Sequence, residues 1–113
     1  MYLEIRQTHG VPQGFDFSTP EILDWELEAI QRALWQQEID IDDHAIQRAR
    51  ERGIAAVQLL EAVVFGEAIS KDLPGNVLGR VPGVNFEHQL DSRWIRIKVA
   101  FFDGYFIVTV HPV

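Results

Sequence analysis

The C-terminal part of the chain contains side chains that suit proton transfer and anion binding. They lie in two β-rich runs separated by Asp103-Gly104, a dipeptide typical of tight hairpin turns. A two-residue turn would place Lys98 opposite Thr109 and Arg96 opposite His111. Side chains alternate between the faces of a strand. One face of the hairpin is therefore predicted to carry Trp94, Arg96, Lys98, Ala100, Phe102, Tyr105, Ile107, Thr109 and His111.

Two interpretations of this polar face stay open. Cations beside aromatic rings indicate a surface that binds anions or stacks RNA bases, and a histidine there titrates near neutral pH. Alternatively, it is an ordinary solvated sheet surface, on which cross-strand pairs each stabilise the fold by about 0.2–1 kcal/mol. The opposite face is wholly apolar and is expected to pack on helices; it carries Ile97, Val99, Phe101, Phe106, Val108 and Val110.

The first helix is predicted to begin at Thr19-Pro20, because Thr19 can cap free backbone N–H groups and proline suits the first helical position. We expect this helix to run to about Gln37. Apolar residues fall on one of its faces at spacings of three and four. They are Leu23, Leu27, Ile30 and Leu34.

The residues that follow predict two more helices and then strands. After an acidic linker over residues 39–43, Asp42 or Asp43 caps a helix that ends at Arg52 before Gly53. The helix over about 55–65 is apolar nearly all round, so we expect it to be buried. Strands are expected over 68–71, 84–90, 94–102 and 105–111, with a short one within residues 1–8. Helices followed by an antiparallel meander predict an α+β fold.

Composition narrows the classes of function. The 113 residues suit one domain, and the absence of cysteine excludes disulfides and thiolate zinc sites and fits a cytoplasmic location. The four histidines form no short metal motif, and no glycine loop that would cradle phosphate is present, so we expect no metal and no cofactor. The charged N-terminus is unlike a signal peptide, and no run approaches the roughly 20 apolar residues that span a bilayer. We therefore expect no membrane association.

The charge is unevenly distributed along the chain. Of the net −7, residues 1–43 contribute −8, from ten acids and two bases, and residues 44–113 contribute +1, from seven acids and eight bases. An acidic protein as a whole gains no attraction to a phosphate backbone. Any nucleic-acid site must therefore be local.

Three segments carry a resemblance to a known family. The run from His44 to Ile54 resembles the His-Ala-x-x-Arg-x-x-Glu-Arg-Gly-Ile motif of the bacterial domain-of-unknown-function family four-two-five-eight. The segments Gly66-Glu67-Ala68-Ile69 and Ile107-Val108-Thr109-Val110 resemble its later Gly-Glu-x-Ile step and its closing strand. The resemblance covers about residues 42–111. It departs at Ala55, where the family tends to have a serine or threonine helix cap.

The resemblance implies a scaffold similar to RelE- and BrnT-like toxins, which cleave RNA without a metal. It divides the chain into an acidic segment over 1–41 and a RelE/BrnT-like core over 42–113. It implies RNA and a cognate antitoxin or other protein as partners. The residues expected to carry catalysis are His111, Lys98, Thr109 and His44. Those expected to bind phosphate or bases are Arg96, Arg48, Arg52, Arg80, Tyr105 and Trp94.

Other hypotheses compete with the endoribonuclease. The chain could be a non-catalytic binding module or subunit that retains the fold, with Trp25 and Trp35 as anchors for a protein partner. Arginines beside a buried helix face can also be purely structural. A third hypothesis has the acidic first helix cover the basic sheet face. The sequence is compatible with an oligomer and does not specify one.

Overall fold

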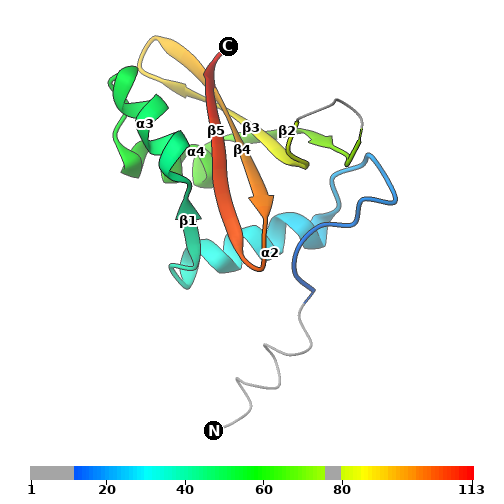
Figure 1. Ribbon diagram of the computed structural model, residues 1–113. Helices are drawn as coiled ribbons and strands as arrows, with labels where there is room; N and C mark the ends of the chain where they lie inside the picture. The colour runs from blue at the N-terminus through cyan, green and yellow to red at the C-terminus, as the bar shows by residue number, and fades with distance from the viewer. Residues whose placement is uncertain (1–11, 76–79) are drawn as a thin grey trace, which may run out of the picture.

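The computed structural model describes residues 12–75 and 80–113, and these form an α+β fold of three helices and a five-stranded sheet (Figure 1). The predicted fold class is confirmed, whereas the strand expected within residues 1–8 lies outside the described residues. The elements are α2 (Asp24–Trp35), β1 (Ile39–Ile41), α3 (Asp43–Glu51), α4 (Ala56–Phe65), β2 (Glu67–Asp72), β3 (Gly83–Leu90), β4 (Arg93–Phe101) and β5 (Tyr105–Pro112).

The sheet has the strand order β1-β5-β4-β3-β2. Strands β2 to β5 form the predicted antiparallel meander. Strand β1 pairs in parallel with β5, with Ile39 opposite Tyr105 and Ile41 opposite Ile107. Residues 39–41 are therefore a strand and not part of a linker. They pair with part of the β5 edge, whose N–H and C=O groups would otherwise lack partners.

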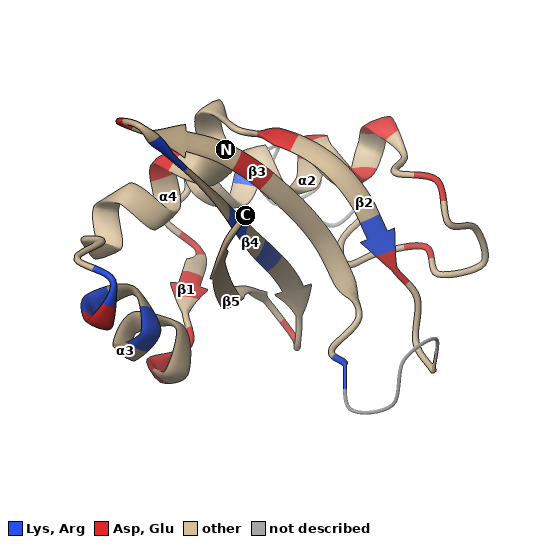
Figure 2. Ribbon diagram, turned by 90° about the horizontal axis from the view of Figure 1, so that it is seen from above, with Lys and Arg blue, Asp and Glu red and all other residues tan. Residues whose placement is uncertain are grey.

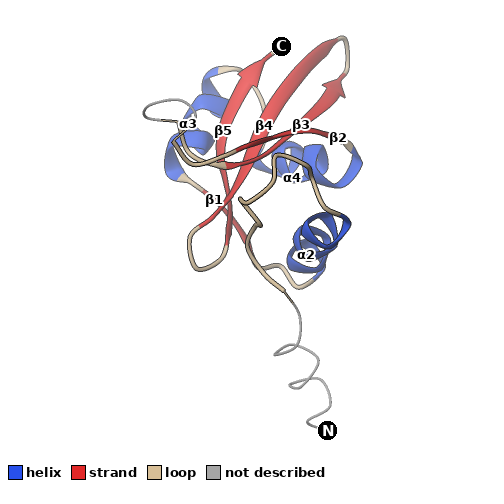
Figure 3. Ribbon diagram, turned by 90° about the vertical axis from the view of Figure 1, so that its right-hand side faces the viewer, coloured by secondary structure: helices blue, strands red, loops and turns tan. Residues whose placement is uncertain are grey.

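The helices pack against one face of the sheet, which we call the inner face; the other is the outer face (Figure 3). The core joins all three helices to the sheet, including Ala29, Ile30 and Ala33 of α2. Helix α4 buries Leu59, Ala62 and Val63 but exposes other apolar residues. The expectation that this helix is buried therefore holds for one face only, because its other faces do not meet the sheet.

Helix α2 begins at Asp24, five residues after the predicted cap at Thr19. Glu26 takes the capping role, since its carboxylate accepts a hydrogen bond from the Leu23 backbone N–H at 2.7 Å. The Thr19 hydroxyl accepts from Glu21 N–H within a turn instead. The residues before Asp24 therefore form a loop whose conformation depends on side chains from elsewhere.

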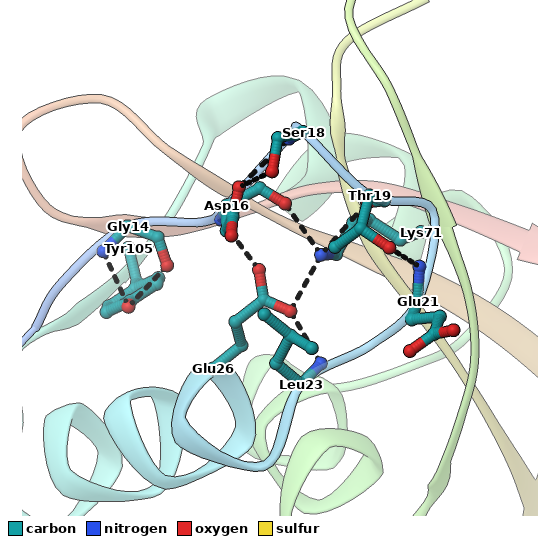
Figure 4. Close-up of polar contacts among 9 residues, drawn as sticks. All are labelled: Gly14, Asp16, Ser18, Thr19, Glu21, Leu23, Glu26, Lys71 and Tyr105. Carbon is teal, nitrogen blue, oxygen red and sulfur yellow. Dashed lines mark hydrogen bonds and ion pairs between the residues drawn. The ribbon is translucent and has the colours of Figure 1, made fainter.

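A buried ion pair holds this loop on the sheet (Figure 4). Lys71 of β2 lies 2.8 Å from the Glu26 carboxylate, and both side chains are fully buried. Lys71 also donates to the carbonyl oxygen of Asp16 at 2.9 Å, and Glu26 accepts from the Asp16 N–H at 2.8 Å. Because these charged groups are paired and hydrogen-bonded, their burial is tolerated. The network connects the acidic segment to β2.

The β4–β5 hairpin differs from prediction near its turn. Phe101 pairs with Tyr105, so the loop has three residues, and Asp103 adopts a positive φ of 54° within it. A register shift between Lys98 and Val99 restores the predicted pairing of Lys98 with Thr109. Between the loop and this shift, each β5 side chain points to the face of the sheet opposite the one predicted for it. Tyr105 and Ile107 are buried in the core, while Phe106 and Val108 are partly exposed.

Candidate functional site

The outer face of the sheet carries two rows of polar side chains that cross the strands. In the first row, Arg96 lies between His111 on β5 and Glu87 on β3. In the second, Lys98 lies between Thr109 on β5 and Asn85 on β3. The predicted neighbours Arg96–His111 and Lys98–Thr109 are thus confirmed. The two rows differ in how far their charges are already paired within the protein.

The second row is built around Lys98, which is only 4% exposed. Its ammonium group lies 2.9 Å from the Asp72 carboxylate and donates to the carbonyl oxygen of Val81 at 2.7 Å. The Asn85 amide donates to the same carboxylate and to the Ser70 hydroxyl, each at 3.0 Å. Lys98 is therefore a neutralised structural cation, which leaves it poorly placed to hold a phosphate.

The same network favours the charged state of the Asp72 carboxylate. Partial burial alone would raise the pKa of Asp72. Hydrogen bonds from Asn85 and Lys98, together with the positive charges of Lys98 and Arg80, outweigh burial and hold the pKa below its usual range. Asp72 is thus ionised at neutral pH and stays paired with Lys98.

The first row ends beside helix α3, which lies along β5. The Asp42 N–H donates to the Ile107 carbonyl at 2.9 Å, and the Arg52 guanidinium donates to the Val110 carbonyl at 3.5 Å. Arg48 lies one helical turn before Arg52 on the same side of α3. Figure 2 shows the basic segments of α3 and β4, with an acidic segment on β3.

We call Arg48, Arg52, Arg96 and His111 the arginine corner. Partial burial and the positive charges of Arg52, Arg96, Lys98 and Arg48 lower the pKa of His111, although its side chain reaches solvent. The imidazole is therefore neutral at pH 7. Within residues 12–75 and 80–113, Arg48 and Arg52 have no carboxylate partner, whereas Arg96 is paired with Glu87.

These four side chains suit phosphate chemistry. A neutral imidazole can accept a proton. Guanidinium groups are always charged and match the geometry of phosphate oxygens. Arg96 is less available to a phosphate, because its Nε and Nη2 atoms both donate hydrogen bonds to the Glu87 carboxylate. Arg48 and Arg52 are accordingly the cations with the most charge left for a ligand.

The remaining predicted site residues lie elsewhere. The Tyr105 hydroxyl accepts from Gly14 N–H at 2.9 Å and donates to the Gly14 carbonyl at 3.1 Å, and burial raises its pKa. Tyr105 is thus a core residue, contrary to its predicted place on the polar face. Trp94 is half-exposed at the start of β4. Arg80 is exposed in the segment before β3.

His44 is exposed in the first turn of α3, where its backbone N–H donates to the Asp42 side chain. This confirms Asp42 as the helix cap. It also places His44 on the same helix as Arg48 and Arg52, two turns from the latter. His44 is therefore on the α3 side of the arginine corner, without a contact that fixes its role.

Two residues near the arginine corner were not among the predicted site residues. Glu87 pairs with Arg96, and Arg93 donates to the Arg52 carbonyl at 2.8 Å. The Glu87–Arg96 pair follows from the β3–β4 hairpin, in which Leu90 pairs with Arg93 across Asp91-Ser92. A two-residue turn at Asp91-Ser92 sets a strand register that places Glu87 opposite Arg96.

Comparison with known proteins found no matching family model, no matching curated protein and no matching solved structure. Among the described residues, no group of three or more histidine, aspartate or glutamate side chains is arranged to hold a metal ion. None of the helices in that part of the chain is long and apolar enough to cross a membrane.

Proposed function

We propose that this protein is a RelE/BrnT-like toxin relative that cleaves RNA in the cytoplasm as a metal-independent endoribonuclease. The observation that carries the proposal is the arginine corner, in which Arg96 pairs across the strands with His111 and Arg52 of α3 donates to the carbonyl of the adjacent Val110. The resemblance of residues 42–111 supports the same function. The acidic net charge of −7 means that this corner must supply the local attraction to RNA.

In the proposed reaction, His111 takes the proton from an RNA 2′-hydroxyl. The 2′-oxygen then attacks the adjacent phosphorus and the bond from phosphorus to the 5′-oxygen breaks. The leaving 5′-oxygen gains a proton, for which His44 is the candidate acid. Arg48 and Arg52 bind the phosphate oxygens and stabilise the charge that develops on them. Lys98 supports the strand beneath the site through its pair with Asp72.

The test is cleavage of a mixed-sequence RNA by the purified protein in excess chelator. His111→Gln removes the base, and we expect activity to fall by about 10²–10⁴-fold. Arg52→Ala should also lower activity strongly. Arg50→Ala is the matched control, because Arg50 is an exposed arginine of the same helix outside the arginine corner. If wild type and His111→Gln leave the RNA equally intact, the proposal is wrong.

A non-catalytic protein-binding module is the second candidate function. The observation that favours it is Trp35, whose side chain is 85% exposed at the end of α2. Aromatic residues of this size often anchor protein interfaces. The partner would be a cognate antitoxin or another protein. Trp25, the other proposed anchor, is half-buried against the core and suits that role less well.

A further inference from the structure

Helices α2 and α4 expose the apolar side chains of Trp35 and Val64, with the half-buried Leu27 nearby. On α2, Leu27, Gln31 and Trp35 are spaced four residues apart and share one face. On α4, the buried Val63 and the exposed Val64 line the same hollow as Leu27 and Gln31. Figure 3 shows the two helices next to each other beside the sheet. We call the space along these five residues the α2–α4 groove.

The groove consists of two adjoining hollows. A hollow of about 100 Å³ separates α2 from the end of α4, lined by Leu27, Gln31, Val63 and Val64, with Phe86 beneath them. A second, shallower hollow runs along α2 to Trp35, and it shares Leu27 and Gln31 with the first. The groove thus offers a recess for an aliphatic side chain, with an exposed indole at one end.

The surroundings of the groove are acidic. Carboxylates of α2, α4 and the first residue of β2 reach solvent around it: Asp24, Glu28, Glu61 and Glu67. None of the four has an ion-pair partner within the described residues. Arg32, which is half-buried, is the one basic residue of α2 and α4. The groove therefore repels nucleic acid and anionic membranes, and a second copy of this chain would present the same negative charges.

We propose that the α2–α4 groove binds an amphipathic, basic helix of a protein partner. Such a helix would place apolar side chains at spacings of three and four residues into the groove, as in other helix-in-groove complexes. One of them fills the recess between Leu27 and Val64 and another packs on Trp35. Its lysines and arginines face Glu28 and Glu61. The residues of this site belong to α2 and α4, whereas those of the arginine corner belong to α3, β4 and β5, so it does not depend on the proposed RNA cleavage.

The test uses three synthetic peptides of about 18 residues, or five helical turns. One is an amphipathic leucine–lysine helix, the second is its leucine–glutamate analogue, and the third has the first peptide's composition in scrambled order. Binding to the full chain is followed by backbone amide shifts and by the Trp35 indole signal. We expect the leucine–lysine helix alone to bind, with shifts concentrated on α2 and α4.

Variants give the test its specificity. Trp35→Ala and Glu28→Lys should each weaken binding by about tenfold. The matched controls are Phe102→Ala in the β4–β5 loop and Glu51→Lys on α3, both at exposed side chains, and each should change binding less than twofold. Equal binding of the scrambled peptide, shifts that map outside α2 and α4, or unchanged affinity of Trp35→Ala would each overturn the proposal. His111→Gln should bind the peptide normally, which separates this site from the nuclease.

Discussion

At the residue scale, the difference between a structural and a functional cation lies in its partners. Lys71 and Lys98 are buried and neutralised by Glu26 and Asp72. Among the described residues, the Arg52 guanidinium hydrogen-bonds only to a backbone carbonyl, and its charge is left for a ligand. Sequence spacing does not distinguish these cases, because the acids that pair with Lys71 and Lys98 come from other elements. The arginine corner therefore emerges only once the strands and α3 are placed together.

The pKa of His111 provides a direct check on the arginine corner. We expect it below the usual value of about 6.5, since burial and neighbouring cations disfavour the charged ring. Removing one cation in Arg52→Ala should raise the pKa. Arg50→Ala should leave it nearly unchanged. Titration of the imidazole signals by NMR measures all three proteins, and a wild-type pKa above 6.5 would contradict the assignment.

The lowered pKa of His111 also makes stability and RNA cleavage depend on pH. The unfolded chain binds a proton at His111 before the folded protein does, so this residue lowers stability as pH falls below about 6.5. Because the folded imidazole stays neutral below that pH, the acid limb of RNA cleavage should lie below pH 6.5. A rate profile from pH 5 to 8 would measure it. An acid limb centred above 6.5 would exclude His111 as the base.

The Lys71–Glu26 pair should be essential for stability. Lys71→Met leaves the buried Glu26 carboxylate without its cation, and breaking a buried pair in this way costs about 3–5 kcal/mol. Urea unfolding measures the free energy. Glu87→Gln, which breaks a partly exposed pair, should cost less than about 1 kcal/mol. Equal effects of the two variants would show that the buried network stabilises little.

At the element scale, local signals predicted the helices and strands well. Asp42 as a cap, Gly53 after α3 and Gly66 after α4 all mark observed ends. The failures have one physical cause, which is that distant partners override local patterns. Thr19-Pro20 does not start α2, because Glu26 and Lys71 fix the preceding loop. The segment over 39–41 is too short to recognise, and it becomes a strand only by pairing with β5.

The β4–β5 hairpin illustrates the same limit within one element pair. The turn position and the Arg96–His111 and Lys98–Thr109 neighbours were predicted correctly. The extra loop residue and the compensating shift near Val99 were not, since Asp103-Gly104 fits both two- and three-residue loops. This single residue moved Tyr105 from the predicted binding face into the core.

Gly66 should tolerate no side chain. A Cβ atom there would lie 2.2 Å from the Ala62 carbonyl oxygen and 2.7 Å from that of Glu87, both of them backbone atoms. Gly66→Ala should therefore destabilise the fold by about 3 kcal/mol. Gly53→Ala is the control, because the space around Gly53 is open and only its positive φ opposes a side chain, at about 1 kcal/mol. Thermal or urea unfolding compares them, and a smaller loss at Gly66 than at Gly53 would be inconsistent with this packing.

At the scale of the whole molecule, the acids of α2 and the cations of the arginine corner lie on different elements. The acids of α2 lie on the inner side with α4, whereas the arginine corner extends from the outer face to the edge of β5. Helix α2 packs through Ala29, Ile30 and Ala33 on the inner face. It therefore does not cover the basic residues of the outer face, as one hypothesis required.

This division predicts weak but salt-dependent RNA binding. With two or three phosphate contacts at the arginine corner, the logarithm of affinity should fall with the logarithm of salt at a slope of about −1.4 to −2.1. Fluorescence anisotropy of a 2′-deoxy-blocked oligonucleotide across a KCl series measures it. Arg50→Ala should keep the slope, and Arg52→Ala should reduce its magnitude by about 0.7. A slope near zero would place binding outside the corner.

The chemistry of the cleaved ends tests the central claim most directly. The protein is incubated in excess chelator with an RNA and with the same RNA carrying 2′-deoxy sugars at the cleaved positions, and the products are identified by mass spectrometry. Attack by the 2′-oxygen predicts that the wild-type protein produces 2′,3′-cyclic phosphate ends from the RNA and none from the deoxy substrate. His111→Gln should produce few such ends from the RNA. Intact RNA, or cleavage that His111→Gln performs equally well, would contradict the proposed function.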